Sequence, residues 1–150
     1  IFELNYLLSK TDVKTVMIKN VISIDENELM EAAAQKMLQH DIGCLPVVNG
    51  SKKVVGILTQ NDIFKSFLDV LGWEHTGSRI TLEVKDEIGA LEKISRIFAD
   101  NHISISNIGV YSSKDGVASM VIRSDAKEVD GIRKALEDGG YTVREAILVQ

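Results

Sequence analysis

The chain has 150 residues, of which 45% are hydrophobic and 26% are charged, and its formal net charge is −5. This composition is typical of a folded globular protein and excludes a disordered chain, while the negative charge argues against a protein that binds nucleic acid phosphates. No apolar run reaches the roughly 18 residues that a membrane span requires. The single cysteine, Cys44, permits no internal disulfide, so we expect a cytoplasmic protein.

The first 42 residues predict a helix, a strand and a second helix. Residues 1–10 carry apolar side chains at helical spacing and predict a helical lead-in. Residues 21–24 predict a strand. Asp25, with Glu28 three residues later, forms a capping-box pattern and predicts the start of a helix. The buried face of that helix is expected to consist of Leu29, Ala33 and Met37.

A hairpin and a further helix are predicted next. Two apolar runs, residues 44–48 and 54–58, are joined through Asn49-Gly50, a sequence that favours a turn. Thr59 then begins a helix that ends at Gly72. Its apolar stripe is expected to consist of Ile63, Phe64, Phe67, Leu68 and Leu71. Residues 73–77 break the periodicity and predict a linker.

The second half predicts the order βαββαβ. Strands are expected at 80–84, 103–110, 117–123 and 142–149, with a turn at Asp115-Gly116. The apolar residues change parity within the second strand, which predicts a bulge near Ser106-Asn107. One helix is expected to bury Leu91, Ile94, Ile97 and Phe98. The other is expected to begin at a capping box of Asp125 and Glu128 and to bury Val129, Ile132 and Leu136. The βαββαβ order is the ferredoxin-like arrangement, so the whole chain is expected to be α+β.

The segment Gly56-Ile57-Leu58-Thr59-Gln60-Asn61-Asp62 joins a strand to a helix. The N–H groups and the partial positive charge at a helix start can hold a phosphate, and a carboxylate three residues later can accept both hydroxyls of a ribose. The alternative is that Thr59 and Asp62 form a capping box that needs no ligand.

Together with Leu45-Pro46-Val47, this segment makes residues 11–72 resemble a CBS (cystathionine β-synthase) repeat with the order βαββα. The resemblance implies a site for an adenine nucleotide (AMP, ADP or ATP) as a regulatory ligand, with the ribose at Asp62 and the phosphate at Thr59. The residues that would enclose the adenine are Asn20, Ile22, Ile42, Gly43 and Cys44. CBS repeats work in pairs, and residues 1–10 resemble the linker between two repeats. The resemblance therefore implies either an upstream repeat or a homodimer or higher oligomer.

The stretch Asp86-Glu87-Ile88-Gly89-Ala90-Leu91 lies between the first strand and the first helix of the second half. Its glycine permits close backbone approach, and a helix start suits a carboxylate ligand, although a loop with a helix cap is the alternative. With the βαββαβ order, this signature makes residues 78–150 resemble an ACT domain. The resemblance implies an amino acid or small carboxylate effector beside Asn107. The pocket wall would consist of Asp86, Ile88, Gly89, Ala90 and Leu91.

The combination of the two domains resembles the acetoin utilisation AcuB type of protein. We therefore predict a non-enzyme: a regulatory sensor with no catalytic residues, no nucleic acid partner, no membrane partner and no metal. The nearest metal-ligand candidates, His40, Cys44, His75 and His102, lack the spacing of a zinc site. Two alternatives stay open: the regulatory tail of an enzyme whose catalytic domain lies upstream, and an oligomerisation module without a ligand.

Overall fold

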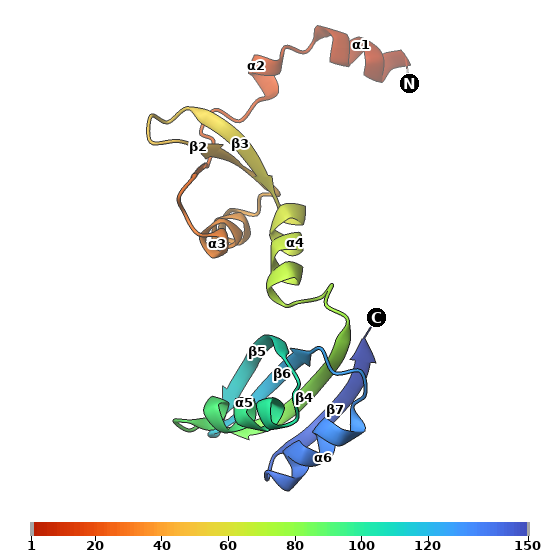
Figure 1. The fold of residues 1–150 in the computed structure, drawn as a ribbon. Helices are drawn as coiled ribbons and strands as arrows, with labels where there is room; N and C mark the ends of the chain where they lie inside the picture. The colour runs from red at the N-terminus through yellow and green to blue at the C-terminus, as the bar shows by residue number, and fades with distance from the viewer. Residues whose placement is uncertain (1, 150) are drawn as a thin grey trace. The chain divides into compact units, whose positions relative to one another are not determined.

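The computed structural model describes residues 2–149, except for the side chains of residues 112–114, and has the predicted mixed α+β composition. The chain divides into two compact units, Ile1–Ile63 and Phe64–Gln150 (Figure 1). Among the described residues, none of the helices is both long enough and apolar enough to cross a membrane.

The first unit contains a small three-stranded sheet with the order β1-β2-β3. β1 runs parallel to β2, and β2 runs antiparallel to β3. Its elements are α1 (Phe2–Lys10), α2 (Val13–Val16), β1 (Ile24–Asp25), α3 (Met30–His40), β2 (Cys44–Val48), β3 (Val54–Thr59) and the first turn of α4 (Gln60–Val70). The order from β1 to α4 is the predicted βαββα.

The start of α3 differs from the prediction. The expected strand at 21–24 is reduced to β1, and α3 begins at Met30 with Leu29 as its N-cap. The Asp25 N–H does donate to Glu28 Oε1, at 3.1 Å, but this bond closes a turn ahead of the helix. Leu29 is consequently 72% exposed, so its predicted place in the core was wrong, whereas Ala33 and Met37 are buried.

The hairpin β2–β3 has the predicted strands but a longer loop. The Asn49 side chain accepts hydrogen bonds from the N–H groups of Ser51 and Lys53, so the loop runs from Asn49 to Lys53. In α4, Ile63 is buried but Phe64 is 63% exposed. Most of the predicted apolar stripe of α4 is therefore uncovered within the chain.

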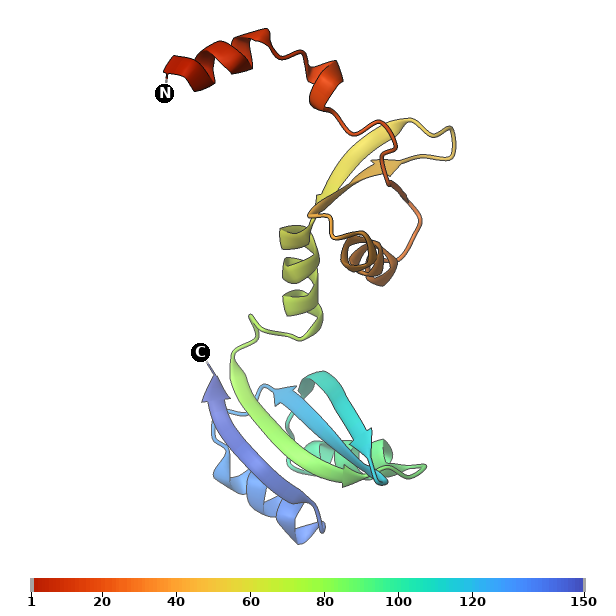
Figure 2. The same cartoon turned by 180° about the vertical axis from the view of Figure 1, so that it is seen from behind.

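The second unit is a four-stranded antiparallel sheet with the order β5-β6-β4-β7. Its elements are β4 (Gly77–Lys85), α5 (Ala90–Asp100), β5 (Ile105–Lys114), β6 (Val117–Ser124), α6 (Asp130–Asp138) and β7 (Thr142–Val149). Both helices cover one face of the sheet, and the opposite face carries no helix (Figures 1 and 2). This is the ferredoxin-like arrangement that the βαββαβ order predicted.

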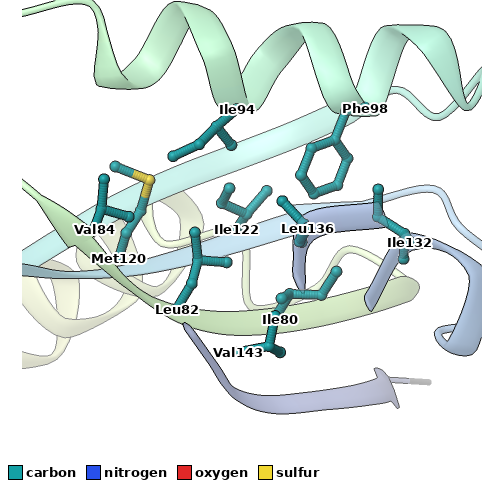
Figure 3. Packing of buried hydrophobic residues seen from close by; sticks show 10 residues of the cluster. All are labelled: Ile80, Leu82, Val84, Ile94, Phe98, Met120, Ile122, Ile132, Leu136 and Val143. Atoms are coloured by element: carbon teal, nitrogen blue, oxygen red, sulfur yellow. The ribbon is translucent and has the colours of Figure 1, made fainter. Parts of the chain in front are cut away.

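The core of the second unit lies between the sheet and its two helices. Alternate residues of β4 point toward the helices, and Ile94 and Phe98 of α5 point back at them (Figure 3). The buried cluster consists of Ile80, Leu82, Val84, Ile94, Phe98, Met120, Ile122, Ile132, Leu136 and Val143. Strict alternation along β4 explains why the sequence pattern located this strand.

Two local predictions in the second unit had different outcomes. The register of β5 against β6 shifts between Ile105 and Asn107, which confirms the predicted bulge. The predicted capping box before α6 was wrong, because Asp125 Oδ1 instead accepts the N–H of Ser104, at 2.8 Å. Glu128 Oε2 accepts the N–H groups of the first helical residues, Asp130 and Gly131.

Candidate functional site

A groove of about 640 Å³ opens in the first unit where the segment before β1 passes the start of β2. Its lining residues are Ile18, Asn20, Val21, Ile22, Asp41, Ile42, Gly43, Cys44 and Pro46. All five residues that the CBS resemblance assigned to the adenine are among them. This volume lies within the usual range of small-molecule sites.

The chemistry of the groove suits an uncharged, flat group. Its lining is mainly aliphatic, and among the residues that the structure describes Asp41 is the one charged residue in it and no lysine or arginine lines it. The Asn20 side chain can both donate and accept hydrogen bonds, as can the exposed backbone edges at Gly43. Asp41 itself ends α3 in a left-handed conformation, at φ 50°, which turns the chain into this wall of the groove.

The start of α4 lies next to the groove. Thr59 pairs with Cys44 across the β2–β3 ladder, and the N–H of Gln60 donates to the carbonyl of Gly43, at 3.0 Å. The two residues assigned to the ribose and the phosphate, Asp62 and Thr59, therefore belong to the same corner of the first unit. Neither residue is among those that line the groove itself.

Asp62 and Thr59 form the capping box that was the alternative interpretation. Asp62 Oδ2 accepts one hydrogen bond from the N–H of Thr59, at 2.8 Å, and another from the Thr59 hydroxyl, at 2.6 Å. The Thr59 hydroxyl oxygen in turn accepts the N–H of Asp62, at 3.3 Å. The capping geometry stabilises the helix start and fixes the carboxylate there.

The loop assigned to an effector in the second unit is open to solvent. The side chain of Ile88 is fully exposed, Leu91 is about half exposed and Ala90 is partly buried. Gly89 has φ 88° and precedes the first residue of α5. The N–H of Asp86 donates to the carbonyl of Gly116, at 2.8 Å, which fixes the loop to the β5–β6 turn.

Asn107 lies at the other end of the sheet. It pairs with Arg123 of β6, which pairs with Arg79 near the start of β4, whereas the loop follows Lys85 at the end of β4. Six residues of extended strand separate these positions by about 20 Å. Within one chain the structure therefore does not bring Asn107 to the loop. Its side-chain amide instead donates to the carbonyl of Val70, at 2.5 Å.

A polar pocket of about 390 Å³, which the sequence patterns did not indicate, includes Glu87 of the same loop in its lining. It is lined by Glu83, Lys85, Glu87, Lys93, Val117, Gly139, Gly140, Tyr141 and Thr142. A hydrogen bond from Lys93 at 2.9 Å lowers the pKa of Glu87, and the same bond raises the pKa of Lys93. The signal available in the sequence was the run of alternating charges around residue 85.

Among the described residues, no group of three or more histidine, cysteine, aspartate or glutamate side chains is arranged to hold a metal ion.

In a comparison with known proteins, two family models match successive parts of the chain. The family model described as the CBS domain matches residues 13–69, and the model described as the ACT domain matches residues 78–138. A homoserine O-acetyltransferase of Methanococcus vannielii is 34% identical over 104 residues, which are 65% of this chain and 20% of that protein.

Two further relatives match about 55 residues each. Hypoxic response protein 1 of Mycobacterium tuberculosis is 40% identical over 53 residues, 35% of this chain and 37% of that protein. The L-aspartate semialdehyde sulfurtransferase of Methanocaldococcus jannaschii is 37% identical over 59 residues, 39% of this chain and 12% of that protein. The chain thus matches less than two fifths of the length of each of these relatives.

Proposed function

We propose that this chain, which contains a CBS domain followed by an ACT domain, is a regulatory sensor that binds an adenine nucleotide in its first unit and an amino acid or similar carboxylate in its second. Both domains are regulatory ligand-binding modules without catalytic groups. The observation that carries the nucleotide proposal is the groove of about 640 Å³, because its lining contains every residue assigned to the adenine.

The groove favours adenine over a charged ligand. Ile22 and Ile42 supply apolar contact for the two faces of a flat ring, and the Asn20 amide supplies hydrogen bonds for its polar edge. A lone phosphate would gain little there, since the groove contains Asp41 and no cation.

The ribose and phosphate would extend from the groove toward the start of α4. A ribose hydroxyl can replace the Thr59 hydroxyl as a donor to Asp62, so that one hydrogen bond is exchanged for another of the same kind. The phosphate would then meet the N-terminal turn of α4, an 11-residue helix whose partial positive charge favours an anion.

A thermal-shift screen of the full chain with AMP, ADP and ATP tests this proposal. A nucleotide at about 100 times its dissociation constant adds about 2.7 kcal/mol, which raises Tm by several degrees. We expect Asp62→Ala to abolish the ligand-induced shift and Asp69→Ala, an exposed carboxylate of the same helix, to retain it. Because Asp62→Ala also removes a helix cap, the quantity to compare is the shift on adding ligand. Equal shifts in both variants would refute the role of Asp62.

For the second unit we propose an amino acid or small carboxylate at Asp86–Leu91 and Asn107, with the loop and Asn107 supplied by different copies of the chain. Their separation along β4 within one chain supports a site completed by a partner. Calorimetry of the full chain against the standard amino acids should detect binding that Gly89→Val weakens. Heat of dilution alone across the series would reject the effector and leave this unit as an oligomerisation module.

A second candidate is a regulatory segment of a larger enzyme. It is favoured by the lengths of the relatives, of which the matched segment occupies 12% in the sulfurtransferase and 20% in the acetyltransferase. The mass of the single polypeptide under denaturing conditions in its native source decides between the candidates: a small chain supports a separate sensor, and a chain several times larger than 16.5 kDa supports the enzyme segment. The acetoin utilisation type and the cytoplasmic location both stay predictions.

A further inference from the structure

Residues 71–76, between α4 and β4, contact the sheet of the second unit through Gly72, which is buried, and Trp73, whereas the other residues of the segment are exposed. Within this segment, which we call the strap, the N–H of Trp73 donates to the carbonyl of Leu68 and the N–H of Gly72 to that of Asp69, both at 3.0 Å. With Gly72 at φ 66°, these bonds form a glycine-terminated helix end. The strap thus begins as an ordered continuation of α4.

The backbone packs closely at Gly72 in the strap and again at Gly77, the first residue of β4. Gly72 is buried, and a Cβ on it would lie 3.0 Å from Asn107 Cβ. Gly77, directly after the strap, has φ 130°, and a Cβ there would lie 2.1 Å from the carbonyl oxygen of Ser124. Only glycine permits these approaches without a shift of the neighbouring atoms.

One side-chain contact holds the strap between these glycines, and a second holds the end of α4 just before it. The Arg123 guanidinium lies 5.7 Å from the centre of the Trp73 ring, within the range of a cation–π contact. Arg123 is buried, so its charge is poorly solvated and the ring is an appropriate partner. The Asn107 amide donates to the carbonyl of Val70, the last residue of α4.

The contact between the Asn107 amide and the Val70 carbonyl uses a side chain that the ACT resemblance assigned to the effector. Asn107 lies at the bulge of β5, which is an edge strand of the sheet. One of its two amide N–H groups is directed at Val70, so a ligand that accepts a hydrogen bond from both N–H groups competes with the end of α4. We propose that the strap masks Asn107, and that a small carboxylate binds there only when the strap opens. This inference rests on the proposed effector function of the second unit.

Nitrogen-15 relaxation on the labelled full chain tests, without any ligand, whether the strap masks Asn107, an arrangement that we call the mask. We expect backbone order parameters of about 0.85 for residues 71–76, as in a rigid element, whereas a flexible linker shows values below about 0.6. Asn107→Asp, which places a carboxylate against the Val70 carbonyl, should lower the strap values below about 0.6. Asn101→Asp is the matched control, because the Asn101 amide also donates to a main-chain carbonyl, that of Ile97, but away from the strap.

Values below about 0.6 in the wild type, or an unchanged strap in a folded Asn107→Asp variant, would overturn the mask. Should Asn107→Asp not fold, Trp73→Ala serves instead, since this side chain is 64% exposed and its removal leaves the core intact. In that case, an unchanged strap in the Trp73→Ala variant would overturn the mask.

Titration with the standard amino acids, followed on the same spectra, tests the opening. An amino acid that shifts the Asn107 amide signals should also lower the strap order parameters. If it shifts Asn107 and leaves the strap ordered, the competition is refuted while the proposed function stands. If no amino acid shifts any signal of the second unit, the proposed function and the competition fail together, and the relaxation comparison alone then decides whether the strap is closed.

Discussion

The two units differ in how completely each buries its own apolar side chains. In the part of the chain that the structure describes, the core of the second unit contains ten buried apolar residues and that of the first unit only five. The first unit leaves Val54, Val55 and Ile57 of β3 more than half exposed. Two helices cover the four-stranded sheet of the second unit, whereas the smaller sheet of the first unit has no such cover over β3.

The difference shows that a short sequence with continuous apolar strands need not complete its own core. We expect the second unit to be stabilised chiefly from within. We expect the first unit to gain much of its stability from a second copy, because an exposed apolar strand of this kind favours association.

Matched leucine substitutions give the largest expected contrast. Leu136→Ala in the second unit removes a fully buried side chain and should lower the free energy of unfolding by about 2–5 kcal/mol. Leu29→Ala in the first unit, where the side chain is 72% exposed, should change it by less than about 0.5 kcal/mol. Urea unfolding followed by far-UV circular dichroism measures both. Similar losses would show that the first unit is packed more completely than its exposure indicates.

Glycine substitutions test the same difference between the two units at the level of the backbone. Gly77→Ala should cost about 2–4 kcal/mol, because its φ of 130° is unfavourable for alanine and its Cβ would overlap the Ser124 carbonyl. Gly50→Ala in the first unit meets nothing within 4 Å, so we expect a change of less than about 0.5 kcal/mol. Thermal unfolding of the two variants provides the measurement. A tolerant Gly77 would contradict the close approach of the start of β4 to β6.

A charge on the exposed strand tests the need for a second copy. The wild type should scatter light as a dimer or larger, and Ile57→Lys should shift the mass toward 16.5 kDa, since a lysine would be desolvated in an apolar interface. Ser51→Lys adds the same charge in the hairpin loop and should leave the mass unchanged. A wild type that stays monomeric at micromolar concentration would remove the proposed association.

Acid titration should show the smallest effect, and a similar one in both units. Hydrogen bonds from Lys36, at 2.8 and 2.9 Å, hold the pKa of Glu28 below its ordinary value of 4.5. In the second unit, Lys93 likewise lowers the pKa of Glu87. A lowered carboxyl pKa stabilises the fold above the unfolded value, and this stabilisation is lost as the pH falls through the folded pKa. The expected window therefore lies below about pH 4.5.

Carbon-13 titration of the glutamate carboxyls measures this effect. Lys36→Met should return the midpoint of Glu28 toward 4.5 and leave that of Glu87 in place. A Glu28 midpoint that does not respond would exclude the ion pair as the cause.

Most of the fold could be predicted from the sequence because period-2 and helical patterns report burial directly. The alternation of Ile80, Leu82 and Val84 and the parity change in β5 are examples. Helix starts were less predictable, since the same spacing of acceptor residues has different uses. The Thr59 and Asp62 pair does cap a helix, whereas Asp25 and Glu28 close a turn before one.

The residues of the candidate sites also differ in how far the sequence could predict their neighbours. The groove brings together residues 20–22 and 42–44, which the CBS resemblance assigned to the adenine, and the binding of adenine there stays a prediction. Asn107 is different, because its partner Val70 is 37 residues away in the chain, and helical periodicity does not indicate which strand contacts the end of a helix. Single-sequence reasoning contains no measure of such a tertiary contact.

Cys44 provides a thiol in the groove that a reagent can modify. It is the only thiol in the chain, it is exposed, and it lies in the wall assigned to the adenine. An alkylating reagent therefore modifies one position, without any need to replace other cysteines. The rate of that alkylation reports whether the groove is occupied, even before the occupant has been identified.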